Sequence, residues 1–407
     1  MLTECKAGEF DGKIYTLVAF VVLWHFFFSS SFVLRLNPQI FWSSIFVLTI
    51  VLAIYKRTPI QGEELKLYGF LFLGFIISFF SGDAWTSIVN GMYFFIYLSV
   101  AAMIARNVSI EKILQMISFF CIVHLVCIYI QVFIPDVYKN LILPLLPSYA
   151  HSDIIDQMTY NASYYGFTVQ TSVAAMYMTI GAITLSVLAK YEQNKISKII
   201  CMVLVGLFVT GVLFTTRRGS IFAICLVLAY IYFDTSGSKL SKVILLFLGV
   251  VFLLSFGIEK IPGMSGVLDK FARLSGNLMN GRQNIWTEAL DNFWKYPIFG
   301  FGVGRAIDAG GGALVDNAYI TVLVERGFVG TAVYFIPIVS LFFVSYRRKK
   351  RCRGNNFAID YSFYVQMLFI IMSFMENYYG QALTMFLYYL AVLCEDFMLW
   401  REIDEDT

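Results

Sequence analysis

The sequence predicts an all-α polytopic membrane protein of about 12 transmembrane helices. Of its 407 residues, 59% are hydrophobic and 14% are charged, whereas a soluble domain carries roughly 25% charged residues. Because a helix needs about 20 apolar residues to cross a bilayer, most of the chain is available for spans. The run LLFLGVVFLLSF (245–256) is apolar at both parities, which argues against the alternating pattern of a transmembrane β-strand.

Charge-poor apolar runs give the predicted spans. They cover residues 14–34, 39–55, 67–81, 84–105, 113–134, 166–189, 196–214, 219–233, 240–257, 317–344, 359–376 and 382–400. The first run lacks a small-x-small cleavage pattern, so we interpret it as an uncleaved span. We expect one integral membrane domain over 1–407, with a long outer loop at 135–165 and a larger one at 258–316, between the ninth and tenth helices.

The distribution of lysine and arginine predicts the orientation of the chain. With the N-terminus inside, most of the 30 basic residues lie in inner segments, including the run RRKKRCR (347–353). Both termini are therefore expected on the cytoplasmic side and both long loops outside. The net charge of +3 is too small to indicate a nucleic-acid partner.

The sequence TTRRGS (215–220) places Arg217 and Arg218 in a short outward turn, against the orientation rule. One interpretation is that both side chains reach toward lipid headgroups. The other is a fixed cationic site for a phosphate group, because a guanidinium group binds two phosphate oxygens at once. Charged residues at membrane depth are functional candidates by default.

The larger outer loop has internal order. From Arg282 to Trp294 the apolar residues recur at spacings of three and four, which predicts an amphipathic helix whose apolar face lies on the membrane or on the helical bundle. The glycine-rich sequence PIFGFGVG (297–304) follows. It is either a flexible loop or a segment whose backbone N–H groups approach an anion, with Arg305 at the rim.

Asp316 stands directly before Asn317 at the start of the tenth predicted helix. It is either the helix N-cap or a carboxylate that accepts a proton from a sugar hydroxyl at an outer pocket. Asn317, Tyr319, Glu325 and Glu376 are secondary candidates for the same site.

The sequence gives no reason to expect a metal or a cofactor. The histidines His25, His124 and His151 share no metal-ligand spacing, and no paired CxxC pattern is present. We interpret His25 and His124 as packed or hydrogen-bonded helix residues.

Together these features resemble the Wzy-type O-antigen polymerases and the related O-antigen ligases. The resemblance rests on the arginine turn TTRRGS, on GRQNIWTEAL and PIFGFGVG in the loop between the ninth and tenth helices, and on the helix start DNAYITVLVERGFVG (316–330). The ligases commonly have a histidine before this asparagine, whereas this chain has Asp316. That departure weakens a ligase interpretation and favours a polymerase.

The resemblance implies a GT-C-like glycosyltransferase of the bacterial inner membrane with a periplasmic active site. It implies polymerisation of lipid-linked oligosaccharide repeat units, which are bound to undecaprenyl pyrophosphate, by metal-independent inverting transfer. Membrane lipids surround such an enzyme, and a chain-length regulator and a flippase of the same pathway are implied partners. An O-antigen ligase and a polysaccharide-repeat transporter or flippase remain the alternatives.

The resemblance also suggests roles for the charged residues. Arg218, Arg282 and Asp316 are the expected catalytic residues, with Asp316 acting on the acceptor hydroxyl. Arg217, Arg218, Arg282 and Arg305 are expected to bind the pyrophosphate, because preorganised cations stabilise the charge that develops on the leaving oxygen.

Overall fold

Every regular element that the computed structural model describes is a helix. The structure describes residues 2–29, 37–56, 60, 62–235, 282–313, 315–352 and 356–406. Six of the described helices are long and apolar enough to cross a membrane, and three shorter apolar helices accompany them. The predicted all-helical polytopic class is therefore confirmed for the described residues.

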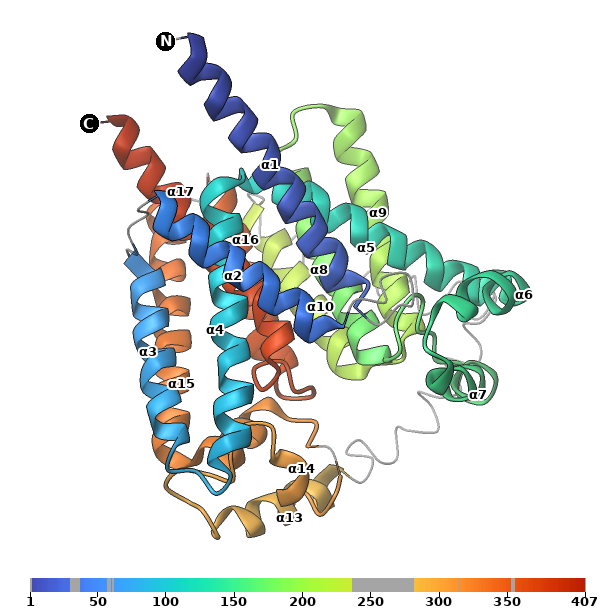
Figure 1. Cartoon of the computed structure of the whole chain (residues 1–407). Helices are drawn as coiled ribbons and strands as arrows, with labels where there is room; N and C mark the ends of the chain where they lie inside the picture. Colours follow the sequence, from blue (N-terminus) through green and yellow to red (C-terminus); the bar gives the residue numbers. More distant parts are fainter. Residues whose placement is uncertain are drawn as a thin grey trace. The chain divides into compact units, whose positions relative to one another are not determined.

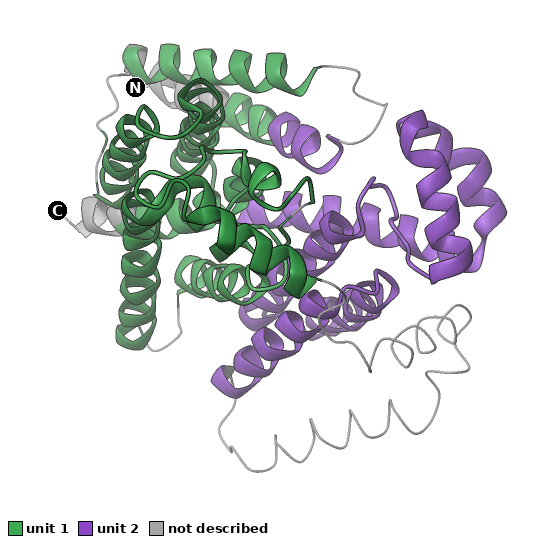
Figure 2. Cartoon of the chain, turned by 90° about the horizontal axis from the view of Figure 1, so that it is seen from below, with its two compact units in different colours: residues 1–19, 36–110, 279–407 green, residues 20–35, 111–278 purple. Residues whose placement is uncertain are grey.

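The predicted spans coincide with described helices except for 240–257, which lies outside the described residues. The first half of the larger outer loop, up to residue 281, also lies outside them. The chain divides into two compact units, one formed by residues 1–19, 36–110 and 279–407 and the other by 20–35 and 111–278 (Figure 2). Helix α1 (Leu2–Phe27) contributes to both units.

Unit 1 is a bundle of long helices (Figure 1). Its helices are α2 (Pro38–Lys56), α3 (Gly62–Ser78), α4 (Ala84–Asn107), α13 (Arg282–Phe293), α14 (Ala306–Ala309), α15 (Ala318–Arg351), α16 (Phe357–Met372) and α17 (Ala382–Asp406). Helix α4 packs along α17, and α3 packs along α15. The short helices α13 and α14 contact α15 and lie at one end of the bundle, here called the Asp316 end.

The opposite end of unit 1, here called the Arg348 end, holds a network of charged side chains. The basic run expected in a cytoplasmic loop begins within α15, which continues to Arg351. Arg348 binds Glu395 at 3.2 Å and Asp396 at 3.4 Å, and buried Lys349 binds buried Asp360. These ion pairs join α15 to α16 and α17.

Unit 2 contains the other long helices and segment 135–165, which the sequence analysis predicted to be an outer loop. Its helices are α5 (Ile110–Phe133), α6 (Pro135–Val137), η2 (Tyr138–Ile142), η3 (Leu143–Leu145), η4 (Ser148–Ala150), α7 (His151–Asn161), α8 (Thr171–Tyr191), α9 (Lys195–Phe214) and α10 (Arg218–Thr235). Segment 135–165 is thus a series of short helical turns.

Two predicted core histidines lie in the interior of unit 2. His25 and His124 are both 1% exposed. The Nε2 atom of His124 lies 3.0 Å from the Phe27 carbonyl oxygen, and its ring stacks on Phe28. The interpretation of these histidines as packed helix residues is confirmed.

The buried pair Lys349–Asp360 provides a test of the packing at the Arg348 end. Asp360→Leu leaves the Lys349 ammonium group buried without its carboxylate, which costs about 3–5 kcal/mol of unfolding free energy. We expect a lower unfolding midpoint in detergent, and we expect the double variant Lys349→Met/Asp360→Leu to recover most of it. Lys66→Ala, which removes a 57% exposed partner of Glu63, is the control and should cost at most about 1 kcal/mol. Equal unfolding midpoints for Asp360→Leu and the wild type would contradict the conclusion that the buried Lys349–Asp360 pair stabilises the Arg348 end.

Candidate functional site

The predicted site residues are divided between the two units. Arg217 and Arg218 belong to unit 2, and all the other candidates belong to unit 1. The unit 1 candidates gather at the Asp316 end, on α13, on α15 and in the segments that join them to their neighbours.

The predicted amphipathic helix in the outer loop is confirmed as α13 (Arg282–Phe293). Ala289 and Phe293 are buried in a small apolar cluster with Ala306 of α14, Val324 of α15 and Val315, which lies between these two helices. The apolar face therefore packs on the protein. The helix holds Arg282, its first residue, at a fixed place on unit 1.

Arg282 forms an ion pair with Asp316. One guanidinium nitrogen lies 3.4 Å from the Asp316 carboxylate, and another donates to the Met375 carbonyl oxygen at 3.2 Å. The two side chains are 25% and 39% exposed, respectively. The pair thus presents a cation and a carboxylate together at an accessible position, which can bind a phosphate group and a hydroxyl group side by side.

Asn317, and not Asp316, is the N-cap of α15. Its side-chain oxygen accepts the N–H groups of Tyr319 and Ile320 at 3.0 and 3.1 Å, and its amide nitrogen donates to the Phe374 carbonyl oxygen. The capping role that we considered for Asp316 is therefore wrong. Its carboxylate is available to pair with Arg282.

The glycine-rich segment 297–304 is tightly packed. Gly300, Gly302 and Gly304 have φ values of 75°, 120° and 87°, which L side chains rarely adopt. A Cβ atom on Gly300 would lie 2.3 Å from the Glu325 carbonyl oxygen, and one on Gly304 would lie 2.3 Å from the Asn90 amide nitrogen. The interpretation of this segment as a flexible loop is wrong.

The segment fills a break in α15. Gly327 interrupts the helix with φ 66° and ψ −175°. The carbonyl oxygens of Val324 and Glu325, freed by this break, accept the N–H groups of Phe301 and Gly302. On the other side of the break, the Phe328 N–H group donates to the Pro297 carbonyl oxygen. The break is therefore closed by hydrogen bonds to the glycine-rich segment.

The Glu325 carboxylate lies at backbone N–H groups of the glycine-rich segment, where we expected an external anion to bind. Its carboxylate is buried, and it accepts the backbone N–H groups of Gly304 and Ala306, the latter at 3.3 Å. The backbone amides at the end of the segment thus serve an internal carboxylate. The interpretation of these amides as a site for an external anion is wrong, and Glu325 acts as a positioning residue for the loop.

Arg305 is paired with two carboxylates. Its guanidinium group lies 3.3 Å from Asp83 and 2.5 Å from Asp308. Asp83 is the N-cap of α4, and hydrogen bonds from the Thr86 N–H and hydroxyl groups hold the pKa of the Asp83 carboxyl below its ordinary value. Binding of a phosphate by Arg305 requires the exchange of at least one of these partners.

Two secondary candidates hold the turn at 373–381. The Tyr319 hydroxyl group donates to the Ile370 carbonyl oxygen at 2.9 Å, and its ring packs on Phe374. Glu376 is 5% exposed within this turn. Glu376 lies in the turn whose Met375 carbonyl oxygen receives Arg282, and Tyr319 lies on α15 and packs on Phe374 of that turn.

The arginine turn lies at the start of α10 in unit 2. Arg218 is the first residue of α10, and the Nε atom of Arg217 donates to the Thr171 hydroxyl group at 2.6 Å. The turn is tied to the end of the smaller outer loop, because the hydroxyl groups of Ser163 and Thr216 lie 2.6 Å apart. The N–H groups of a helix N-terminus add positive charge to the two guanidinium groups.

Beside the turn, Tyr165 of the same loop donates a hydrogen bond to Asp153 at 2.8 Å. Burial raises the pKa of the Tyr165 hydroxyl, and the neighbouring Asp153 carboxylate raises it further. Tyr165 is therefore a neutral hydrogen-bonding group beside the arginine turn.

Unit 1 contains two cavities of similar size. The first, here called the Tyr93 cavity, has a volume of about 390 Å³ and lies toward the Asp316 end. Its lining includes Gln39, Trp42, Asn90, Tyr93, Tyr97 and Gly304. No local sequence pattern indicates this cavity, because its walls come from α2, α4, α17 and the glycine-rich segment.

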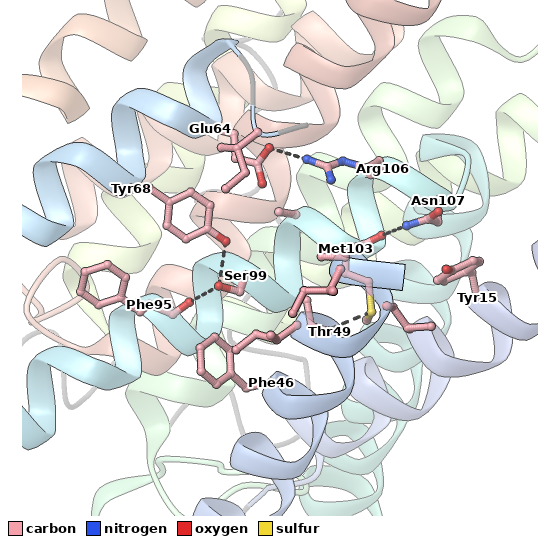
Figure 3. Close-up of a pocket in the computed structure, with 16 residues that line it drawn as sticks. Tyr15, Phe46, Thr49, Glu64, Tyr68, Phe95, Ser99, Met103, Arg106 and Asn107 are labelled. Atoms are coloured by element: carbon pink, nitrogen blue, oxygen red, sulfur yellow. Dashed lines mark hydrogen bonds and ion pairs between the residues drawn. The ribbon is translucent and has the colours of Figure 1, made fainter. Parts of the chain in front are cut away.

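The second cavity, here called the Tyr68 cavity, has a volume of about 400 Å³ and lies between α1, α2, α3 and α4 (Figure 3). Its polar groups bond to one another. Arg106 pairs with Glu64 at 2.5 Å, and the Tyr68 hydroxyl group donates to Ser99 at 2.7 Å. Its remaining wall is largely apolar.

Comparison with known proteins gives one match. Residues 203–335 match the family model described as O-antigen ligase. No curated protein matches the chain. The match covers about a third of the chain and shows that these residues are similar to that family. The matched residues include both arginines of the turn, Arg282, Arg305 and Asp316.

The packing of the glycine-rich segment leads to a stability prediction. In Gly300→Ala the new methyl group meets the backbone of Glu325 and the residue must keep a positive φ, which costs of order 1–3 kcal/mol for the backbone conformation before the clash is counted. We expect a clear fall in the thermal unfolding midpoint of the purified protein. Gly74→Ala, in α3 with nothing within 4 Å of its added Cβ, is the matched control and should leave the midpoint unchanged or slightly raised. Equal unfolding midpoints for Gly300→Ala and Gly74→Ala would show that the glycine-rich segment is not tightly packed at Gly300.

Proposed function

We propose that the protein polymerises lipid-linked oligosaccharide repeat units at the periplasmic face of the bacterial inner membrane. The donor is a glycan on undecaprenyl pyrophosphate, and the acceptor is a single lipid-linked repeat. The proposal is carried by one observation, the partly exposed Arg282–Asp316 pair at 3.4 Å, which lies in the stretch that matches the family model.

The pair has the two charges that an inverting transfer needs. The acceptor hydroxyl oxygen attacks the anomeric carbon of the donor while the bond from that carbon to the pyrophosphate oxygen breaks. The electron pair of the broken bond stays on pyrophosphate, where Arg282 stabilises the charge as it develops. The hydroxyl proton passes to the Asp316 carboxylate, which acts as the general base.

The other arginines have roles as phosphate contacts in this proposal. Arg217 and Arg218 bind phosphate oxygens at the N-terminus of α10, where the helix dipole adds to their charge. Arg305 binds phosphate after one of its carboxylate partners, Asp83 or Asp308, has been displaced. In unit 1 we assign the transition-state role to Arg282, and in unit 2 we assign the first phosphate contact to Arg218.

An O-antigen ligase is the second candidate, because the matched family model carries that description. A ligase transfers the finished glycan to the lipid A core, whereas a polymerase extends the glycan on its lipid carrier. We favour the polymerase because Asp316 occupies the position before Asn317 where the ligases commonly have a histidine. A carboxylate paired with arginine is also able to accept a proton from a sugar hydroxyl.

Deletion of the gene separates the two enzymes. A polymerase deletion leaves lipopolysaccharide core with one repeat unit, because ligation continues without extension. A ligase deletion leaves core without any repeat. We expect the first pattern on a lipopolysaccharide gel, together with a restored ladder when the gene is returned on a plasmid. A normal ladder in the deletion strain would exclude both enzymes, and core without repeats would replace the polymerase by the ligase.

Substitution of the arginines tests the chemistry. Arg282→Ala and Arg218→Ala each remove a cation that stabilises the leaving group, and the loss of one such preorganised group costs about 10²–10³ in rate. We expect loss of long chains in the complemented deletion strain at normal protein levels. Lys295→Ala, an exposed cation directly after α13, should keep the full ladder. Retention of long chains in Arg282→Ala would remove this residue from the catalytic site.

A further inference from the structure

The Tyr93 cavity contains polar groups that the protein does not use. Tyr93, Tyr97 and the exposed Gln39 line it, and within the described part of the chain the side chains of these three residues form no hydrogen bond. The Asn90 amide nitrogen donates to the Val303 carbonyl oxygen at 2.8 Å, which leaves the Asn90 side-chain oxygen to face other groups. Several donors and acceptors thus converge on one open space of about 390 Å³.

The described side chains that line the Tyr93 cavity are uncharged. Its side chains are aromatic, amide or apolar, and no charged side chain of the described residues lines the cavity. Trp42 and Tyr97 pack edge to face at 4.6 Å between ring centroids, and Tyr93 lies beside Tyr97. A sugar ring offers C–H groups to an aromatic face and hydroxyl groups to phenols and planar amides. A neutral saccharide therefore fits this lining, and a phosphate group does not.

The cavity shares parts of its wall with two segments that hold charged candidates. Val303 and Gly304 line the cavity at the end of the glycine-rich segment, directly before Arg305. Gly380 lines it at the end of the turn whose Met375 carbonyl oxygen binds Arg282. The turn that receives Arg282 and the segment that leads to Arg305 thus both form part of the cavity wall.

We propose that the Tyr93 cavity binds the neutral sugar end of the acceptor repeat unit. This assignment rests on the proposed polymerase function and adds to it the residues that hold the acceptor. Tyr93, Tyr97 and Gln39 bind sugar hydroxyl groups, and Trp42 provides an apolar wall. Asn90 is a positioning residue, because its amide also holds the glycine-rich segment.

The Tyr68 cavity is a useful contrast. It has nearly the same volume, about 400 Å³, but its named polar groups are already bonded inside the protein. A ligand hydroxyl group entering it has to break the Tyr68–Ser99 or Glu64–Arg106 interaction. The cavities therefore differ in free hydrogen-bonding capacity and not in size, which makes Tyr68→Phe a matched control for Tyr93→Phe.

The test measures binding of a sugar that lacks phosphate. The probe is the free oligosaccharide repeat, released by mild acid from the lipid-linked unit of the same cells. It is titrated into the purified full-length protein in detergent, and binding is followed by saturation-transfer NMR and calorimetry. Tyr93→Phe and Gln39→Leu each remove a neutral hydrogen bond, so we expect the Kd to rise about three- to tenfold for each. Tyr68→Phe should bind like the wild type, and unfolding midpoints check that each variant is folded.

The outcomes separate this assignment from the polymerase itself. If the wild type does not bind the free repeat, or if both cavity variants bind it as tightly as the wild type, the Tyr93 cavity is not the acceptor site. If Tyr68→Phe weakens binding as much as Tyr93→Phe, the saccharide assignment to the Tyr93 cavity is also overturned. If the variants weaken binding while the deletion strain keeps a normal ladder, the saccharide site stands and the polymerase function fails.

Discussion

The buried carboxylate of Glu325 is the interaction on which the Asp316 end of unit 1 depends. An ionised group is costly to bury unless hydrogen bonds replace the lost water. Here the replacement comes from the backbone N–H groups of Gly304 and Ala306. Since these amides belong to the glycine-rich segment, α15 and that segment hold each other in place. Arg305, Val303 and the wall of the Tyr93 cavity take their positions from this contact.

The neighbouring residue Arg326 is a cation that is buried in a different environment. Arg326 follows Glu325 in the chain, yet its guanidinium carbon lies over the rings of Tyr334 and Phe94, at 4.5 and 5.1 Å from their centroids. The residue is 9% exposed, and its Nε atom has no hydrogen-bond partner within the described residues. Stacking on aromatic rings stabilises such a buried cation. Glu325 accepts backbone N–H groups and Arg326 lies against aromatic faces, and the two opposite charges also attract each other.

The sequence predicted the positions of the described helices well, six of which are long and apolar enough to cross a membrane, and it predicted the site only in part. Apolar runs of the right length determine helices, because each residue in a bilayer must satisfy its backbone polar groups locally. The periodicity after Arg282 likewise predicted α13, since a helix of this kind needs only local sequence. Asp83, which pairs with Arg305 from a distant part of the chain, carries a capping pattern with Thr86 but no sign of its partner. Contacts of that kind depend on tertiary packing, which local pattern does not encode.

The break in α15 has a consequence for the biogenesis of the protein. A span that enters the bilayer with unpaired carbonyl and N–H groups at Gly327 is unfavourable, because hydrocarbon offers those groups no partner. The hydrogen-bond partners of these groups, at Pro297, Phe301 and Gly302, precede the span in the chain. They are therefore synthesised first and can form these hydrogen bonds only after α15 has been made. Docking of this segment is thus a late step of assembly, after membrane insertion has delivered the helix that receives it.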